Sequence, residues 1–328
     1  MSRALKIALL CAFCLLVIVG ALAWGAPIPL SDLWSGDAAK SEIARHIFLE
    51  LRPPRAIAAL LVGASLAVAG AGLQTMFGNP LAEPYLLGIS AGGALGATAS
   101  VALKLPPIGA FDAGALLAFV GALATALTVY ALGQGRGDSS TNNSARLLLI
   151  GVAISALLSA LMSLVIALSG RLEFAQQVSF WLLGSFGRSS WPQNVVLLLA
   201  FIGGTLLLLG SARDLNALRA GDDDAAALGV EVVALHRRIL LAASLLSAAS
   251  VAAAGLIGFI GLLAPHIVRL LGARDVRALL PASALGGATL LVACDAVARG
   301  AFAPIEIPVG IVTALLGVPL FLSVARRM

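Results

Sequence analysis

The sequence predicts an all-α polytopic membrane protein that crosses the bilayer about ten times, with both ends of the chain in the cytoplasm. Hydrophobic residues make up 60% of the 328 residues, whereas Asp, Glu, Lys and Arg make up only 11%. Soluble domains carry about 25% charged residues, so this chain has too few to cover a water-exposed globule. Its charges also separate long uncharged intervals, most of them long enough for a membrane-spanning helix.

The first uncharged interval runs from Ile7 to Ser31. A secretory signal has an apolar stretch of about 7–15 residues, whereas this interval is long enough to cross about 30 Å of hydrocarbon, so we interpret it as an uncleaved first span. The later intervals lie between Arg55 and Glu83, Glu83 and Lys104, Asp112 and Arg136, Arg146 and Arg171, Arg188 and Arg213, Arg238 and Arg269, Arg277 and Asp295, and Glu306 and Arg326.

One interval, from Ile239 to Val268, is longer than a single span needs. Glycines and Pro265 interrupt its second half, which predicts one full helix followed by a short one. The tenth span that results keeps the basic residues at 269–277 and Arg326-Arg327 inside, as the positive-inside tendency expects.

The ten-span arrangement makes residues 1–328 a single transmembrane domain with four distinctive connecting segments. The segment at 178–191 contains Phe180-Trp181 and Trp191, aromatic residues typical of membrane interfaces, and we expect a short helix there at the outer surface. The four segments are an outer loop at 27–54, an inner loop at 77–85 without Lys or Arg, the outer short helix at 178–191 and a long inner loop at 213–237.

The long inner loop contains a predicted short helix within Gly221–Gly229. Asp222, Asp223 and Asp224 would lie at its amino end, where the helix dipole favours negative charge, and Gly229 would end it. This segment is either a docking site for a partner that supplies energy or a solvated connector, and the loop alone leaves both readings open.

Catalytic and nucleic-acid-binding functions are disfavoured. The only lysines are Lys6, Lys40 and Lys104, none within a nucleotide-binding loop, and the sequence has no recognisable hydrolase motif or set of metal ligands. We therefore expect no enzyme activity, no intrinsic cofactor and no metal, and the membrane lipid as surroundings. The candidate coupling carboxylates Glu83, Asp295 and Glu306 fall at span ends, which argues against a secondary transporter driven by an ion gradient.

A weak internal echo connects two distant parts of the chain. Ala71-Gly72-Leu73 and Ala254-Gly255-Leu256 lie in helices that are expected to run in opposite directions, as in an inverted repeat. In a chain so rich in alanine, chance is an equal explanation.

Several spaced motifs carry a family resemblance. They are Leu51-Arg52-Pro53-Pro54-Arg55, Asn79-Pro80-Leu81-Ala82-Glu83-Pro84, Leu87-Gly88-Ile89-Ser90, Gly258-Phe259-Ile260-Gly261-Leu262, Pro265-His266-Ile267-Val268-Arg269, Asp295 through Arg299, and Glu306-Ile307-Pro308-Val309-Gly310. With them, the chain resembles the permease subunits of type II ATP-binding-cassette importers for haem, iron-siderophores and cobalamin. The resemblance implies a homodimer, two separate ATPase subunits that bind ATP, a periplasmic substrate-binding protein and a bacterial inner membrane.

The resemblance also implies roles for particular residues. Arg52, Arg55 and Arg299 would dock the binding protein, with headgroup contact as the alternative, and Asn79 and Leu81 would form the cytoplasmic gate. The pathway would be lined by Ser155, Ser159, Met162 and Ser163, residues that also suit helix packing. The ATPase-coupling residues would be Gly221, Asp222, Asp223, Asp224, Ala225, Leu228 and Gly229.

The cargo implied by the resemblance is an iron-containing chelate, with haem first and ferric siderophore or cobalamin as alternatives. Ser179-Phe180-Trp181 is more similar to haem permeases, in which an Arg often precedes the aromatic pair; here Gln176 and Gln177 stand near that place. Arg171 could substitute for it as a cargo contact. We interpret His266 as structural, because the motif that contains it also occurs in permeases for other cargo.

Overall fold

The computed structural model describes residues 12–21, 34, 37–133 and 140–326, and within them the regular structure is helical. In the described part of the chain, six long apolar helices and four shorter ones match the expected ten spans. The amino-terminal helix is described only for Ala12–Ala21, so the rest of the predicted first span lies outside the described residues. The other nine are α3 Arg52–Met76, α4 Ile89–Ala102, α5 Ala113–Gly133, α6 Ser140–Ser169, α8 Trp191–Gly210, α11 Val232–Ala254, α12 Ile260–Leu270, α13 Val276–Gly300 and α14 Val309–Ala325.

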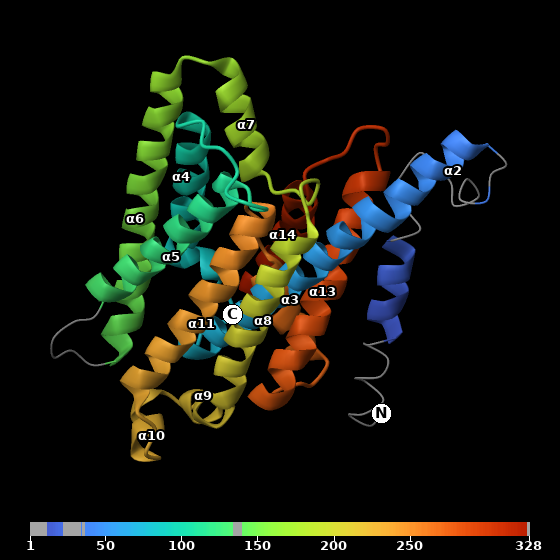
Figure 1. Cartoon of the computed structure of the whole chain (residues 1–328). Coiled ribbons are helices and arrows are strands. Elements are labelled where there is room, and N and C mark those ends of the chain that lie inside the picture. Colours follow the sequence, from blue (N-terminus) through green and yellow to red (C-terminus); the bar gives the residue numbers. More distant parts are fainter. Residues whose placement is uncertain (1–11, 22–33, 35–36, 134–139, 327–328) are drawn as a thin grey trace.

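The helices run between two ends of the molecule (Figure 1). The junction of α6 with α7 (Leu172–Leu182) and the loop before α14 lie at the upper end, whereas α9 (Ala212–Leu218) and α10 (Asp222–Ala227) lie at the lower end. This division agrees with the predicted alternation of outer and inner loops. We therefore call the upper end the outer end and the lower one the inner end.

The central helix is α3, which packs against α13, α11, α12 and α8. Glycine and alanine let its backbone approach its neighbours closely, as is typical of helix packing in membranes. A Cβ atom added at Gly70 would lie 1.9 Å from the carbonyl oxygen of Gly261 on α12, and one at Gly63 would lie 2.3 Å from that of Gly287 on α13. These two crossings fix the positions of α12 and α13.

We expect Gly70→Ala to reduce the yield of folded protein sharply, because its methyl group would meet backbone atoms that cannot rotate away. Overpacking a core typically costs about 1–3 kcal/mol, and a backbone collision belongs at the upper end of that range. The apparent Tm in detergent measures the effect. Gly203→Ala on α8, whose new Cβ atom would meet nothing closer than 3.9 Å, is the control and should leave Tm nearly unchanged.

The expected outer loop at 27–54 differs from the structure over its described part. From Ala38 the chain is helical through α2 (Ala38–Arg45) and a wider π-helical segment, η2 (His46–Leu51), which continues directly into α3. Pro53 and Pro54 lack amide donors, and the amide of Arg52 donates to the carbonyl oxygen of Ile47, one residue beyond the usual α-helical spacing. A π segment of this kind lets a helix continue, with a bend, where prolines remove two donors.

The expected outer short helix also lies elsewhere than predicted. Helix α7 covers Leu172–Leu182, whereas much of the predicted range 178–191 is irregular between Leu183 and Ser190. The prediction relied on the aromatic residues rather than on the buried positions Phe174 and Val178, which recur at helical spacing. The break between α11 and α12, by contrast, is confirmed, with Gly255 and Phe259 at φ of 72° and 71°.

Candidate functional site

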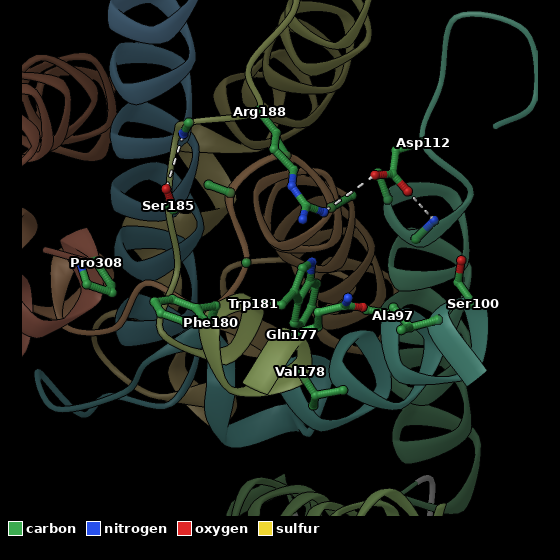
Figure 2. Close-up of a pocket in the computed structure, with 18 of the residues that line it drawn as sticks. Ala97, Ser100, Asp112, Gln177, Val178, Phe180, Trp181, Ser185, Arg188 and Pro308 are labelled. Atoms are coloured by element: carbon green, nitrogen blue, oxygen red, sulfur yellow. Dashed lines mark hydrogen bonds and ion pairs between the residues drawn. The ribbon is translucent and has the colours of Figure 1, made fainter. Parts of the chain in front are cut away.

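A pocket of about 710 Å³ opens at the outer end of the subunit (Figure 2). Helix α4, the start of α5, the irregular segment after α7 and the end of α11 form its walls. Helix α7 contributes Glu173, Gln177 and Trp181, which are spaced four residues apart and therefore share one face. Phe174 and Val178 follow two of these residues by one position, which places them about 100° around the helix. Both are buried, and Val178 also lines the pocket.

The charged residues of the pocket are partly paired. Arg188 lies 3.8 Å from Asp112, and both side chains are well exposed, so this ion pair contributes little to stability. Asp112 also accepts from the amide of Gly114 at 2.6 Å, next to the first turn of α5. Glu306, at the pocket's edge, accepts from Arg55 at 2.8 Å. Acidic, amide and aromatic groups together suit a large ligand with both polar and flat apolar surface.

An ionic cluster lies beside the pocket at the outer ends of α3 and α13. Asp295 is 2% exposed and accepts from Arg55 at 3.0 Å and from Arg299 at 3.1 Å. Arg299 also donates to the carbonyl oxygen of Ala21 at 2.8 Å, which ties the amino-terminal helix to α13. The guanidinium of Arg52 lies 3.8 Å from the ring centre of Phe48. The cluster thus joins four helical segments.

The docking roles of Arg52, Arg55 and Arg299 stay predictions, but two of the three side chains are buried. Arg52 and Arg299 are only 5% and 6% exposed. Arg55 is nearer the surface, because it also contacts Glu306, whose side chain is half exposed. All three arginines belong to motifs visible in the sequence, whereas the contacts of Asp295 with Arg55 and Arg299 were not predicted.

The inner loop that contains Asn79 and Leu81 begins as an exposed turn. The side-chain oxygen of Asn79 accepts from the amide of Leu81 at 2.8 Å, which holds the turn rigidly, and Leu81 is half-buried. Beyond it, the chain turns back toward the interior, because Glu83 accepts from the amide of Phe259 at 2.5 Å. The hydroxyl of Tyr85 accepts from the amide of Ile257 at 3.1 Å. Sequence analysis missed both contacts.

The predicted pathway residues lie on α6, a helix with unusually little buried surface. Only 6% of its most apolar stretch is buried within the subunit. Ser159 and Ser163 are exposed, whereas Ser155 and Met162 are half-buried. The hydroxyls of Ser155 and Ser163 donate to carbonyl oxygens one turn earlier, at 2.7 and 2.9 Å. These bonds satisfy the hydroxyl donors and leave their oxygens able to accept.

Arg171, the predicted cargo contact, lies at the start of α7 and not in the pocket lining. It is exposed, and its guanidinium carbon lies 5.9 Å from the ring centre of Phe174. The structure therefore does not bring Arg171 together with Trp181 in one site. Among the described residues, no group of three His, Cys, Asp or Glu side chains could hold a metal ion.

The short helix predicted within Gly221–Gly229 is present as α10, Asp222–Ala227. Gly221 precedes it at φ 124° and Gly229 follows it at φ 85°, conformations that favour glycine at both positions. Asp223 and Asp224 are exposed, and Ala225 is fully buried against the subunit. Leu228, just past the helix, is 73% exposed at the inner end. Asp222 lies 3.5 Å from His236 near the start of α11.

Helix α9 fixes the base of this segment. Arg219, just past the end of α9, donates to the carbonyl oxygen of Arg274 at 2.8 Å, and Asn216 donates to Asp275 at 3.0 Å. The side-chain oxygen of Asn216 also accepts from the amide of Val276 at 3.1 Å. The segment is therefore attached to the loop between α12 and α13 as well as to α11.

Comparisons with known proteins support one family. The model of the FecCD transport family matches residues 9–327. The chain is 44% identical to the cobalamin import system permease protein BtuC of Halobacterium salinarum, over 87% of this chain and 74% of that protein. It is 43% identical to the hemin transport system permease protein HmuU of Yersinia pestis, over 86% of this chain and 84% of that protein.

A solved structure is similar over almost the whole chain. It is an inward-facing transporter described as being of the metal-chelate ABC type, with a TM-score of 0.83 and 31% identity, and the match covers 97% of this chain and 98% of that one. The PsaBC structure from Streptococcus pneumoniae, at 17% identity and a TM-score of 0.59, shares the fold alone.

Proposed function

The chain belongs to the FecCD transport family, and from this we propose how its residues serve the import of a metal chelate. It is a multi-pass membrane permease of an ATP-binding-cassette importer, and its motifs were correctly identified as those of this family. We propose that two copies form the pathway, that separate ATPase subunits supply the energy and that a periplasmic binding protein delivers the cargo.

The observation that carries this proposal is the exposure of α6. An apolar helix with so little of its surface buried must face lipid or a second subunit. Ser159 and Ser163 place exposed polar oxygen atoms on it, which is unfavourable against lipid and suitable in a solvated pathway. We propose that α6 of each copy lines the path between the subunits, with Ser155, Ser159, Met162 and Ser163 along it.

We propose that the inner mouth of this path is closed by Asn79 and Leu81. The bond between the Asn79 side chain and the Leu81 amide makes the turn one rigid piece. A rigid turn can move between two positions as a unit, which suits a gate.

We propose that α10 and Leu228 dock the ATPase subunit. Asp222, Asp223 and Asp224 give this surface negative charge, and Leu228 adds a large exposed apolar side chain. Exposed apolar groups rimmed by charge are typical of protein interfaces. Asp223 and Asp224 are exposed, and the buried Ala225 fixes the side of α10 that packs against the rest of the chain.

For the binding protein, Arg55 is the strongest of the three proposed docking residues. Its partner Glu306 is half exposed, so a carboxylate of an arriving protein can exchange with it. Arg52 and Arg299 support Arg55 from buried positions, and we propose that they contribute to the field at this surface rather than to direct contact.

We propose haem as the first cargo to test, with cobalamin and ferric siderophore as alternatives. The exposed ring of Phe180 and the Trp181 ring at the pocket offer flat apolar surface to a planar macrocycle. Arg171 stays a proposed cargo contact, although it lies at the start of α7 and outside the pocket lining. The chain is 44% identical to the cobalamin permease and 43% identical to the hemin permease, so sequence identity favours neither cargo.

The test is cargo-dependent ATP hydrolysis by the complete importer in lipid vesicles. With its binding protein present, we expect haem to stimulate hydrolysis and to be taken up even when a protonophore has collapsed the ion gradients. Stimulation by cobalamin or a ferric siderophore alone would replace haem with that cargo. Uptake by the permease alone, abolished by the protonophore, would contradict the ATP-driven mechanism.

A further inference from the structure

Two hydrogen bonds join the inner loop to the break between α11 and α12. Glu83 accepts from the amide of Phe259 at 2.5 Å, and the hydroxyl of Tyr85 accepts from the amide of Ile257 at 3.1 Å. The partners are 176 and 172 residues apart in the sequence. Each bond therefore joins two segments that lie far apart in the sequence.

The amide groups around the break between α11 and α12 need hydrogen-bond acceptors from other segments. Residues 255–259 are not helical, and α12 begins at Ile260, so amides at its start have no acceptor within the helix. A carboxylate at a helix amino end is also favoured by the helix dipole. Glu83 supplies that carboxylate, while Ala82 and Pro84 on either side of it are buried and leave it little freedom to move.

A second set of contacts holds the same loop from the α3 side. The side chain of Gln74, near the end of α3, donates to the carbonyl oxygen of Gly261 at 3.1 Å and accepts from Arg269 of α12. The end of α3, the loop after it and the first turn of α12 are thereby joined into one unit. This unit contains the proposed gate residues Asn79 and Leu81, which lie between Gln74 and Glu83 in the sequence.

Helix α11 connects this unit to the inner surface. It begins at Val232, directly after the coupling segment, and Asp222 of α10 lies 3.5 Å from His236 in its second turn. It ends at Ala254, next to the break that Glu83 and Tyr85 contact. A single helix therefore runs from the proposed ATPase surface to the residues that hold the gate loop.

We propose that Glu83 and Tyr85 are positioning residues that attach the gate loop to the break after α11, so that movement of α10 and α11 is transmitted to Asn79 and Leu81. This inference rests on the proposed function, because it takes the inner loop as the gate and α10 as the docking helix. Rigid-body movement of a packed helix is a common way to transmit such a change.

The test compares Glu83→Ala with Glu83→Gln in the complete importer in lipid vesicles. Alanine removes the acceptor, so we expect ATP hydrolysis to continue while uptake per ATP falls about tenfold, the order of effect expected for losing a hydrogen bond to a charged group. Glutamine keeps an acceptor oxygen at the same place and should restore most of the ratio. Glu42→Ala, which removes an exposed carboxylate from α2, is the control and should not change it.

Tyr85→Phe keeps the test decisive if Glu83→Ala does not fold. It removes a single hydroxyl and should lower uptake per ATP by a smaller factor than Glu83→Ala, with a faster leak of cargo from loaded vesicles without ATP. The inference would be overturned if Tyr85→Phe and any folded Glu83→Ala kept the wild-type uptake per ATP and the wild-type rate of cargo leak. A folded Glu83→Gln that transports no better than Glu83→Ala would also overturn it.

A separate measurement tests the gate itself. Leu81→Cys in a variant without the native cysteines should form a disulfide between the two copies and block uptake. If the disulfide forms and uptake continues, the proposed gate is wrong. If the disulfide blocks uptake while Glu83→Ala keeps the normal uptake per ATP, the proposed gate is supported and only the role of Glu83 is overturned.

Discussion

Replacing Asp295 by alanine is expected to remove most of the folded protein. The substitution leaves the guanidinium groups of Arg55 and Arg299 without the buried carboxylate that both contact. Removing one partner from a buried ion pair typically costs about 3–5 kcal/mol, because the remaining charge stays desolvated and unpaired. The loss would also loosen the amino-terminal helix, which Arg299 holds through Ala21.

The measurement is the apparent Tm and the monodisperse fraction in detergent. The control is Glu50→Ala, which breaks an exposed contact with His46 at 2.7 Å and should cost less than about 1 kcal/mol. If Asp295→Ala were as stable as the wild type but lost affinity for the binding protein, the cluster would serve docking rather than folding.

Reversing Asp222, Asp223 and Asp224 to lysine is expected to separate the permease from its ATPase subunits and to abolish uptake. Positive charge at the amino end of α10 opposes the helix dipole and removes the negative surface proposed for docking. We expect binding of the ATPase subunit to weaken at least about 100-fold, which corresponds to about 2.7 kcal/mol. Leu228→Asp, which places a charge on an exposed apolar contact, should act in the same direction.

Co-purification and titration of the ATPase subunit measure this effect. Lys104→Glu, a charge reversal between α4 and α5 far from α10 in the fold, is the control and should leave binding unchanged. Full assembly of the triple lysine variant would show that α10 is a solvated connector, the alternative that the sequence left open.

The sequence determined the features that depend on local rules. The ten apolar segments, the break between α11 and α12, and α10 with glycine on both sides all follow from neighbouring residues, because span length, helix interruption and capping act over a few positions. Prediction failed at residues 38–54, where an outer loop was expected and the π-helical segment η2 instead continues α2 into α3.

The tertiary structure alone decided which distant groups meet. Arg55 and Asp295 are 240 residues apart, and Glu83 and Phe259 are 176 apart, so no periodicity or spacing relates them. The sequence showed three arginines at an outer end and could not tell exposed charges from a buried cluster. That difference depends on the packing that brings Asp295 and the carbonyl oxygen of Ala21 to Arg299. A charge takes its role from the groups that packing brings within hydrogen-bonding distance, and packing brings together residues far apart in the chain.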